Sequence, residues 1–292
     1  RGDIICIGGT SQWPATIFRG IDQWGEKYGY ILVDPIGGAI GAFSHADGIS
    51  TGGQARTPIC KMPNIEHTEQ DFPVLFLYRK EVPDSGGAGK FRGGLSAESC
   101  FIPHNTPSIT QDTLSSGNAT PTATGMMGGY PGTTNEYKYV RHSDIQDRIK
   151  SRKMIDDIAE VVGESVTLQL RQINFEQFPA DVYSVVCSAA GGFGDPLDRD
   201  PQKVKEDVDA HSVTGDGARE MYGVIIEPGT GEIDHKATES LRTDIRNARL
   251  NGHHLKPMKV NGELLLEVTE NIHLRSEKGR TVYCCAKCCT EI

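Results

Sequence analysis

Long apolar runs and an excess of positive charge are both missing from this sequence. A membrane-spanning helix needs about 20 consecutive apolar residues, and no stretch of the chain approaches that length. The 292 residues include 30 lysines and arginines against 39 aspartates and glutamates, which gives a net charge of −9. An acidic chain without basic runs is poorly suited to binding a nucleic-acid backbone. The sequence therefore predicts neither an integral membrane protein nor a nucleic-acid-binding protein.

Signals for secretion and for a disulfide framework are absent too. Residues 1–10 lack the pattern of a signal peptide. Of the eight cysteines, four are scattered along the chain and four are crowded into residues 284–289. Such spacing is typical of reduced thiols, so we expect a cytoplasmic protein. Because the first residue is Arg1 and not Met, we also expect a fragment, a processed product or an incomplete subunit.

Glycine and proline are abundant instead. The chain has 34 glycines and 15 prolines, which favour turns and close backbone approaches over a helical bundle. We therefore predict an α+β fold. A β-rich, mixed-sheet core with glycine-rich loops is expected over residues 1–194, and a smaller region of helices and hairpins over residues 195–292.

Periodicity places individual elements within the core region. Residues 1–103 show no helical period, and residues 104–135, rich in Ser, Thr, Gly, Pro and Asn, are predicted as loop throughout. One apolar stripe predicts a helix over residues 145–162. Apolar runs and alternation predict strands at residues 4–7, 28–35, 74–78 and 165–173.

The tail begins with a clear helix start. Asp200 is a good cap residue, and Pro201 fits the first helical position. Two more helices are predicted at residues 218–222 and 237–250, a strand at 222–226, and extended or hairpin segments at 262–268, 272–274 and 282–283.

The densest group of reactive side chains lies in residues 84–94, DSGGAGKFRGG, which hold five glycines. The candidate catalytic residues are Asp84, Ser85 and Arg92, and the candidate cofactor-binding residues are Gly86, Gly87 and Gly89. The spacing of a phosphate-binding P-loop or a dinucleotide fingerprint is missing, and no base for Ser85 is evident. The alternatives are a rigid loop that packs against its own backbone and a loop that faces a substrate or another subunit.

A second group combines imidazoles and carboxylates. His45 and Asp47 are candidate catalytic residues, and Glu66, His67 and Glu69 follow them in the same region. Side chains of these types can bind a divalent metal or act as acid and base. No established metal-binding spacing connects them, so surface positions and hydrogen bonds within loops are the alternative.

The third group consists of thiols. The candidate metal ligands are Cys284, Cys285, Cys288 and Cys289. A Cys-x-x-Cys pair is half of a zinc knuckle. Adjacent cysteines point apart, so a structural zinc needs further ligands, such as His273 or a residue of another subunit. A reduced tail and a redox pair are the alternatives.

Several segments, in this order, resemble the hydantoinase B/oxoprolinase family. The matching segments are residues 37–42, 47–48, 63–66, 84–94, 125–132, 191–196 and 198–201, which include the runs GGAIGA, PNIE, DSGGAGKFRGG, GMMGGYPG and GGFGDP. The resemblance covers only the C-terminal half of the family's usual chain. The run after Asp47 and Gly48, together with the cysteine-rich end, is most similar to the acetone and acetophenone carboxylase branch.

This resemblance implies a subunit of an ATP-dependent, multisubunit ketone carboxylase that helps form the site where an enol phosphate is carboxylated. It implies a hydantoinase A-like partner that binds ATP and magnesium, a chain that supplies the N-terminal half with a divalent metal, and a small-molecule substrate. The alternatives are a subunit of an ATP-dependent cyclic-amide hydrolase, of the hydantoinase, oxoprolinase or lactamase type, and a non-catalytic scaffold subunit.

Overall fold

The computed structural model describes residues 14–32, 38–54, 57–58, 62–169, 171–252 and 259–289. By its contacts the chain divides into two compact units, residues 1–242 and 243–292, which we describe separately. The strand predicted at residues 4–7 lies outside the described residues. The boundary predicted at 194/195 falls inside the larger unit, because the helices that follow it pack onto the preceding loops.

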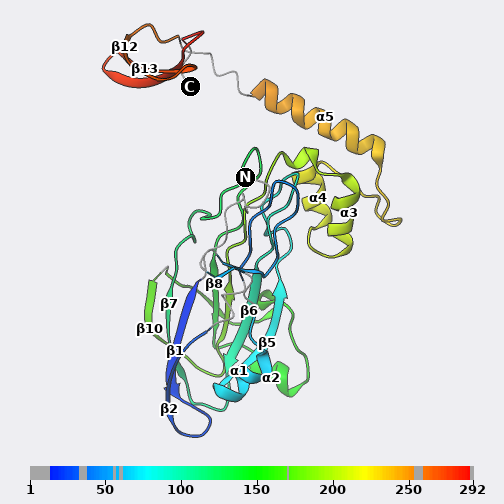
Figure 1. Ribbon diagram of the computed structural model, residues 1–292. Helices are drawn as coiled ribbons and strands as arrows, with labels where there is room; N and C mark the ends of the chain where they lie inside the picture. The colour runs from blue at the N-terminus through cyan, green and yellow to red at the C-terminus, as the bar shows by residue number, and fades with distance from the viewer. Residues whose placement is uncertain are drawn as a thin grey trace. The chain divides into compact units, whose positions relative to one another are not determined.

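Two antiparallel sheets form the body of the larger unit (Figure 1). The four-stranded sheet has the order β10-β7-β1-β2, formed by Arg171–Gln177, Ile109–Leu114, Ala15–Ile21 and Lys27–Ile31. The five-stranded sheet has the order β5-β6-β11-β8-β9, formed by Val74–Glu81, Ala97–Pro103, Val182–Val186, Glu136–Arg141 and Glu164–Thr167. A short ribbon pairs β3 (Gly53–Gln54) with β4 (Thr57–Pro58). The α+β fold is therefore confirmed.

An aromatic core lies between these two sheets. Phe18 of the first sheet meets Phe101 of the second edge to face, with ring centroids 5.4 Å apart, and Phe101 continues to Tyr183 at 5.3 Å. All three side chains are fully buried. The hydroxyls of Tyr183 and Thr16 lie 3.1 Å apart, which satisfies the polar end of the buried tyrosine. Aromatic packing across the sheets thus fixes how they face one another.

A second core covers the opposite face of the five-stranded sheet. Ile145 in α2 (Ile145–Lys150) and Ile158 in a short 3₁₀ turn (Ile158–Glu160) pack there. The single helix predicted over 145–162 is wrong. Arg152 has a positive φ of 58°, which stops α2, and Asp157 forms a capping box that starts a new turn.

Other differences from the sequence predictions have local causes. The loop predicted over 104–135 contains β7, because its inward residues Gln111 and Thr113 are polar and hide the alternation of a strand. Helix α1 (Ile65–Asp71) lies where no helix was predicted; Asn64 caps it by accepting the N–H of Glu66. The strand predicted at 222–226 is wrong, since Gly223 ends a helix there.

Helices α3 (Pro201–Asp209) and α4 (Gly215–Tyr222) were correctly predicted and pack against the glycine-rich loops. The 3₁₀ turn Pro196–Asp198 precedes them, and α5 (His235–Gly252) follows them, running from the larger unit into the smaller one. Among the described helices, none combines the length and apolar composition that crossing a bilayer requires.

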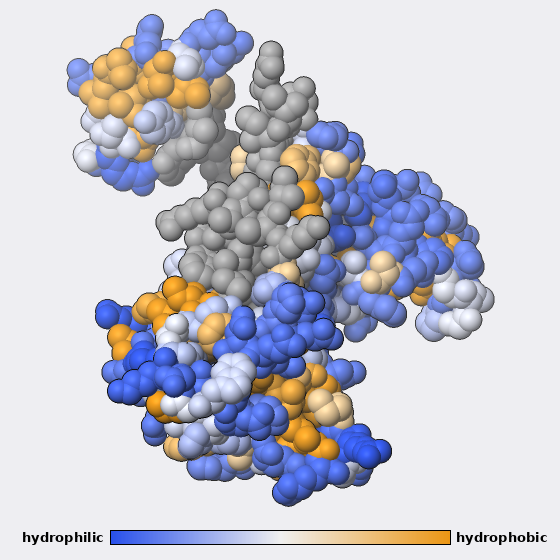
Figure 2. Space-filling model, turned by 60° about the horizontal axis from the view of Figure 1, so that its bottom comes forward, coloured by the Kyte–Doolittle hydropathy of each residue, from blue (hydrophilic) through white to orange (hydrophobic). Residues whose placement is uncertain are grey.

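The smaller unit contains a three-stranded antiparallel sheet, β12-β13-β14, formed by Glu263–Thr269, Ile272–Glu277 and Arg280–Cys285. Its core consists of Val260, Val282 and Cys284. The apolar side chains of β12 stay exposed, and Figure 2 shows apolar residues gathered on the surface of this unit. The extended segments predicted at 262–268, 272–274 and 282–283 are confirmed as strands, and 272–274 pairs with 282–283 as the predicted hairpin, whereas β12 pairs with β13 and not across a turn at Asn261 and Gly262.

Candidate functional site

Four loop segments, residues 38–49, 86–95, 123–132 and 187–194, pack directly against one another. We call them the glycine-rich layer; helices α3 and α4 pack on it through Ala88 (Figure 1). The segments are joined by hydrogen bonds from Gly94 N–H to the Ile40 carbonyl, Gly87 N–H to Ala190, Tyr130 N–H to Ala88 and Met126 N–H to Gly192, at 3.1, 2.8, 2.7 and 2.9 Å. The layer is thus held by backbone bonds that run outside the two sheets.

Glycine is needed in this layer because the backbones of neighbouring segments approach one another closely. A Cβ atom on Gly93 would lie 2.0 Å from the Ala190 carbonyl oxygen, and one on Gly87 would lie 2.2 Å from that of Tyr130. Both distances are far below van der Waals contact, and neither glycine has a positive φ. The layer therefore excludes side chains at these positions for steric reasons.

The three glycines predicted to bind a cofactor lie inside this packing. A Cβ atom on Gly86 would meet the Gly93 carbonyl oxygen at 2.3 Å, and one on Gly89 would meet that of Phe91 at 2.6 Å. Together with Gly87, they admit the chain's own backbone at the place where the sequence suggested a ligand. This arrangement matches the packing alternative for residues 84–94.

A network of four charges, of which only the Asp47 side chain is substantially exposed at 30%, ties the layer to the 3₁₀ turn and α3. Arg199 donates from Nη1 and Nη2 to the two carboxylate oxygens of Asp47, at 2.6 and 2.8 Å. Its Nη2 also donates to Asp207 at 2.8 Å, and Arg92 donates to the other Asp207 oxygen at 3.1 Å. The Arg92 N–H reaches Asp47 at 2.7 Å. Two arginines and two aspartates thus neutralise one another.

Burial and pairing act in opposite directions on these groups. The Arg199 side chain is 1% exposed and that of Asp207 is 11% exposed. Burial is the largest single influence on Asp47 and disfavours its ionised form, but the hydrogen bonds and positive charges of Arg199 and Arg92 together outweigh it and hold the pKa below the ordinary value. For Arg199, burial is likewise the largest single influence and lowers the pKa, but Asp47 and Asp207 together with Tyr222 outweigh it and raise the pKa. Both groups therefore stay charged at neutral pH.

Sequence reasoning singled out Asp47 and Arg92 but missed Arg199 and Asp207. A signal was present, because Arg199 lies in the run GDPLDRDP at 194–201, which carries part of the family resemblance. In the structure Asp47 and Arg92 are neighbours, as a shared site requires. Their charged groups are committed to the network.

Asp84 and Ser85 connect loops at another part of the layer. Asp84 accepts from the backbone N–H of Thr214 at 3.0 Å and from its hydroxyl at 2.6 Å, just before α4. The Ser85 hydroxyl donates to the Val82 carbonyl at 2.6 Å and accepts from the Ser96 N–H at 3.0 Å. Both partners of Ser85 are backbone groups, so its hydroxyl is anchored without a general base.

The imidazoles and carboxylates around Asp47 do not converge. His45 is exposed, and its ring lies 5.9 Å from that of Phe43. Glu69 accepts the N–H of Phe76 at 2.7 Å, while Glu66 and His67 are exposed on α1. Surface positions and loop hydrogen bonds, the alternative for this group, describe what the structure shows.

The four tail cysteines are free thiols in different environments. Cys284 is fully buried on β14 and pairs in register with His273 on β13, whereas Cys288 is exposed. The Cys289 N–H donates to the Cys285 carbonyl at 2.8 Å, which closes a turn over the Cys-x-x-Cys pair. Across the described ranges, no three His, Cys, Asp or Glu side chains are placed to hold a metal ion. These residues alone do not form a complete zinc site.

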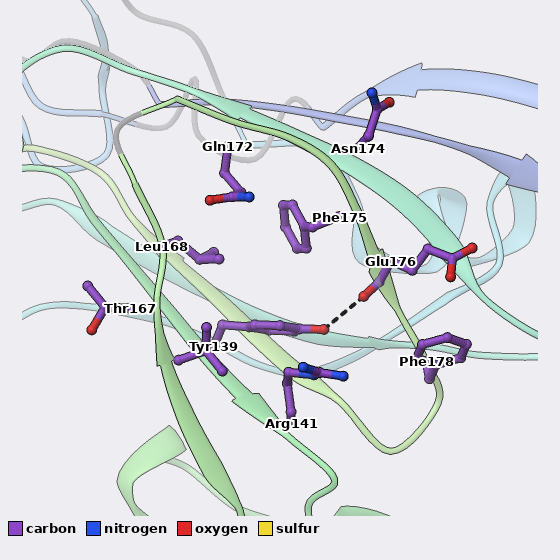
Figure 3. A pocket seen from close by; sticks show the side chains of 10 residues that line it. Tyr139, Arg141, Thr167, Leu168, Gln172, Asn174, Phe175, Glu176 and Phe178 are labelled. Carbon is purple, nitrogen blue, oxygen red and sulfur yellow. Dashed lines mark hydrogen bonds between the residues drawn. The ribbon is translucent and has the colours of Figure 1, made fainter.

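A pocket of about 380 Å³ opens between β8, β9 and β10, and sequence reasoning missed it. Figure 3 shows its lining: Tyr139, Arg141, Val166, Thr167, Leu168, Gln172, Asn174, Phe175, Glu176 and Phe178. The lining residues come from two segments about 30 positions apart, and no short motif connects them. It is separate from the four-charge network, with which it shares no residue.

Comparison with known proteins identifies relatives over most of the chain. It is 30% identical over 258 residues to the alpha subunit of acetone carboxylase from Xanthobacter autotrophicus, which covers 82% of this chain and 33% of the relative. It is 27% identical to the delta subunit of acetophenone carboxylase from Aromatoleum aromaticum, covering 80% and 36%. The beta subunit of caprolactamase from Pseudomonas jessenii is 32% identical over 61% of this chain and 28% of the relative. The chain thus spans about a third of the length of these relatives.

Solved structures agree with these similarities. The nucleotide-free structure of acetone carboxylase aligns with a TM-score of 0.72 and 26% identity, over 82% of this chain and 33% of that chain. The ATP-dependent caprolactamase of Pseudomonas jessenii aligns with a TM-score of 0.64 at 24% identity, over 80% and 38%, which shows a shared fold. The family model for hydantoinase B/oxoprolinase matches residues 2–196, and the chain is therefore a member of the hydantoinase B/oxoprolinase family.

Proposed function

We propose that this chain acts within a multisubunit, ATP-dependent ketone carboxylase and helps form the site where an enol phosphate is carboxylated. The observation that carries the proposal is the similarity to the acetone carboxylase alpha subunit across 82% of the chain, in sequence and in fold. The similarity to the acetophenone carboxylase delta subunit supports the same class of enzyme, because the name of that enzyme also specifies a ketone.

The chemistry divides between partners in this proposal. A hydantoinase A-like subunit binds ATP and Mg²⁺ and phosphorylates the substrate oxygen, which turns a poor leaving group into a good one. A second chain supplies the N-terminal half of the fold with its divalent metal. The glycine-rich layer and its four-charge network give this chain a rigid scaffold on which such a site can be held in position.

Exposed apolar side chains in the layer are suited to contact with a partner subunit. Met126, Met127 and Tyr130 are 44%, 76% and 40% exposed, and they lie in one segment of the glycine-rich layer. Methionine and aromatic residues are enriched in protein–protein interfaces. A structural zinc at Cys285 and Cys288 belongs to the same proposal, with its remaining ligands from another chain.

Hydrolysis of a cyclic amide is the second candidate function. The caprolactamase beta subunit is 32% identical over 61% of the chain, and this similarity favours hydrolysis. Both reactions begin with ATP-dependent activation of a carbonyl-type oxygen and differ in what attacks next. Water opens the ring in one, and carbon dioxide or carboxyl phosphate meets the enol phosphate in the other.

The test is isolation of the native assembly, identification of its chains by native mass spectrometry, and measurement of ATP turnover. We expect an ATP-binding partner and turnover that requires both a ketone and bicarbonate, with labelled bicarbonate incorporated into product. Turnover with lactams or hydantoins and without bicarbonate would establish the hydrolase instead. A chain that isolates as a lone monomer contradicts both proposals.

A further inference from the structure

The pocket between β8, β9 and β10 has an aromatic floor. Tyr139 and Phe175 pack edge to face, with ring centroids 5.5 Å apart and an interplanar angle of 65°. Val166 and Leu168 continue this apolar surface, and Figure 3 shows Leu168 and Phe175 on the same side of the Tyr139 ring. These side chains form the outer margin of the core between the sheets, so the floor is rigid before any ligand arrives.

A β-bulge holds Phe175 in the pocket wall. The register of β10 against β7 shifts between Gln172 and Phe175, and Asn174 has a positive φ of 57°. The Asn174 N–H donates to Asp112 at 2.7 Å, and Arg19 donates to the Asn174 side chain as well as to Asp112. Bulges commonly redirect side chains toward binding sites. Asn174 is thus held in place by the Arg19–Asp112 ion pair, whose residues do not line the pocket.

The cation of the pocket, Arg141, forms no ion pair within the part of the chain that the structure describes. Arg141 lines the pocket, and its guanidinium has no ion-pair or hydrogen-bond partner among the described residues. The nearby carboxylate of Asp181 is satisfied by neutral donors: the Tyr139 hydroxyl and the N–H groups of His142 and Phe178, each at 2.9 Å. In Figure 3 the Glu176 carboxylate points away from the floor. Arg141 therefore borders an apolar surface and forms no ion pair with either of the nearby glutamates, Glu176 of the pocket lining and Glu164, which lies opposite it in register.

We propose that this pocket binds a small organic carboxylate, with the carboxylate on Arg141 and the hydrocarbon body on Phe175 and Leu168. A guanidinium matches the two oxygens of a carboxylate. A volume of about 380 Å³ is suited to a small ligand. A single arginine beside a hydrocarbon floor suits a singly charged acid better than a phosphate, which gathers several donors. The site goes beyond the proposed carboxylase function and does not depend on it.

The experiment titrates the full 292-residue chain with benzoate and, as its neutral isostere, benzamide, followed by ligand-observed NMR. Wild-type protein is compared with Arg141→Gln and with Arg152→Gln, which alters an exposed arginine outside the pocket. We expect saturable benzoate binding that weakens about tenfold or more in Arg141→Gln, since a charge-assisted hydrogen bond is lost. Arg152→Gln binds like wild type, and benzamide binds about tenfold more weakly than benzoate.

Two results would overturn the proposal. One is benzoate that shows no saturable binding at millimolar concentration, and the other is benzoate that binds equally well to Arg141→Gln. Thermal melts of both variants identify any loss of folding. If Arg141→Gln is unfolded, Leu168→Ala replaces it, because Leu168 is a half-buried pocket residue on which the hydrocarbon body rests. Unchanged benzoate binding in that variant and equal binding of benzamide also contradict the assignment.

Discussion

Arg199 and Asp47 lie 152 positions apart and form a two-point ion pair, with Nη1–Oδ1 and Nη2–Oδ2 distances of 2.6 and 2.8 Å. Arg199 also donates to the Lys90 carbonyl at 3.2 Å and to Asp207. A single guanidinium therefore joins an early loop, the loop at 84–94 and helix α3. The tail helices are attached to the glycine-rich layer through this residue.

Replacement of Arg199 by Met should strongly destabilise the larger unit. The change leaves the buried Asp207 carboxylate and the partly exposed Asp47 carboxylate without Arg199, and breaking a buried ion pair typically costs about 3–5 kcal/mol. The measurement is the free energy of unfolding in urea. Lys205→Met is the control, because it removes a pair with Asp209, whose side chain is 60% exposed, and an exposed pair of this kind should change stability little. Equal effects of the two changes would show that the network contributes little.

A methyl group on Gly93 should disrupt the glycine-rich layer. The new Cβ would lie 2.0 Å from the backbone oxygen of Ala190, which cannot move aside as a side chain can. Overpacking of this kind costs about 1–3 kcal/mol or more, and we expect the upper end for Gly93→Ala. The control is Gly215→Ala at the start of α4, where no atom lies within 4 Å. That change should be neutral or stabilising by about 0.5 kcal/mol. A stable Gly93→Ala protein would contradict the packing described here.

The ion pair of Asp47 predicts a loss of stability in acid. Burial raises its pKa, but the hydrogen bonds and charges of Arg199 and Arg92 together outweigh burial and hold the pKa below the ordinary value. As the pH falls, the unfolded chain, in which an Asp has a pKa of about 3.9, binds this proton first. The contribution is therefore complete above about pH 5 and is lost as the pH falls through the lower pKa of the folded state.

Urea unfolding from about pH 3 to pH 7 measures this contribution. Asp47→Asn should be less stable than wild type at neutral pH and should lose less additional stability in acid. The difference between the two proteins therefore narrows toward low pH. A difference that stays constant over this range would mean that Asp47 does not titrate with folding.

Local sequence signals were sufficient where one segment carries the whole pattern. The strand over 74–78 and the helix that starts after Asp200 follow from apolar runs, capping and proline placement, and both are confirmed. Strand β7 did not follow from its sequence, because its buried residues Gln111 and Thr113 are polar. The side-chain N–H of Gln111 donates to the side-chain oxygen of Gln177 on the neighbouring strand. A hydrogen bond between strands that lie far apart in the sequence cannot be predicted from either segment alone.

The candidate site shows the same difference between local signals, which the sequence contains, and contacts between distant segments, which it does not. The glycines of 84–94 indicated a close backbone approach, which the structure contains, but the sequence could not show that the neighbour is the chain itself. Asp47 and Arg92 were recognised as charged residues near glycines. Their partners Arg199 and Asp207 lie more than 100 positions away, and only the fold brings the four charges together.

The cysteines should differ sharply in reactivity toward an alkylating reagent. Cys100 is fully buried on β6, with its side chain in the core that covers one face of the five-stranded sheet, and burial raises its thiol pKa far above the ordinary value, so little thiolate forms. Cys187 is buried too, whereas Cys288 is exposed in the turn after β14. Iodoacetamide labelling of the native chain, with the labelled peptides mapped by mass spectrometry, should modify Cys288 well before Cys100 or Cys187. All three should react at similar rates in urea. Native labelling of Cys100 as fast as that of Cys288 would contradict this prediction and show that the sheet opens readily. The variant Cys288→Ser is the control that identifies the peptide labelled at Cys288.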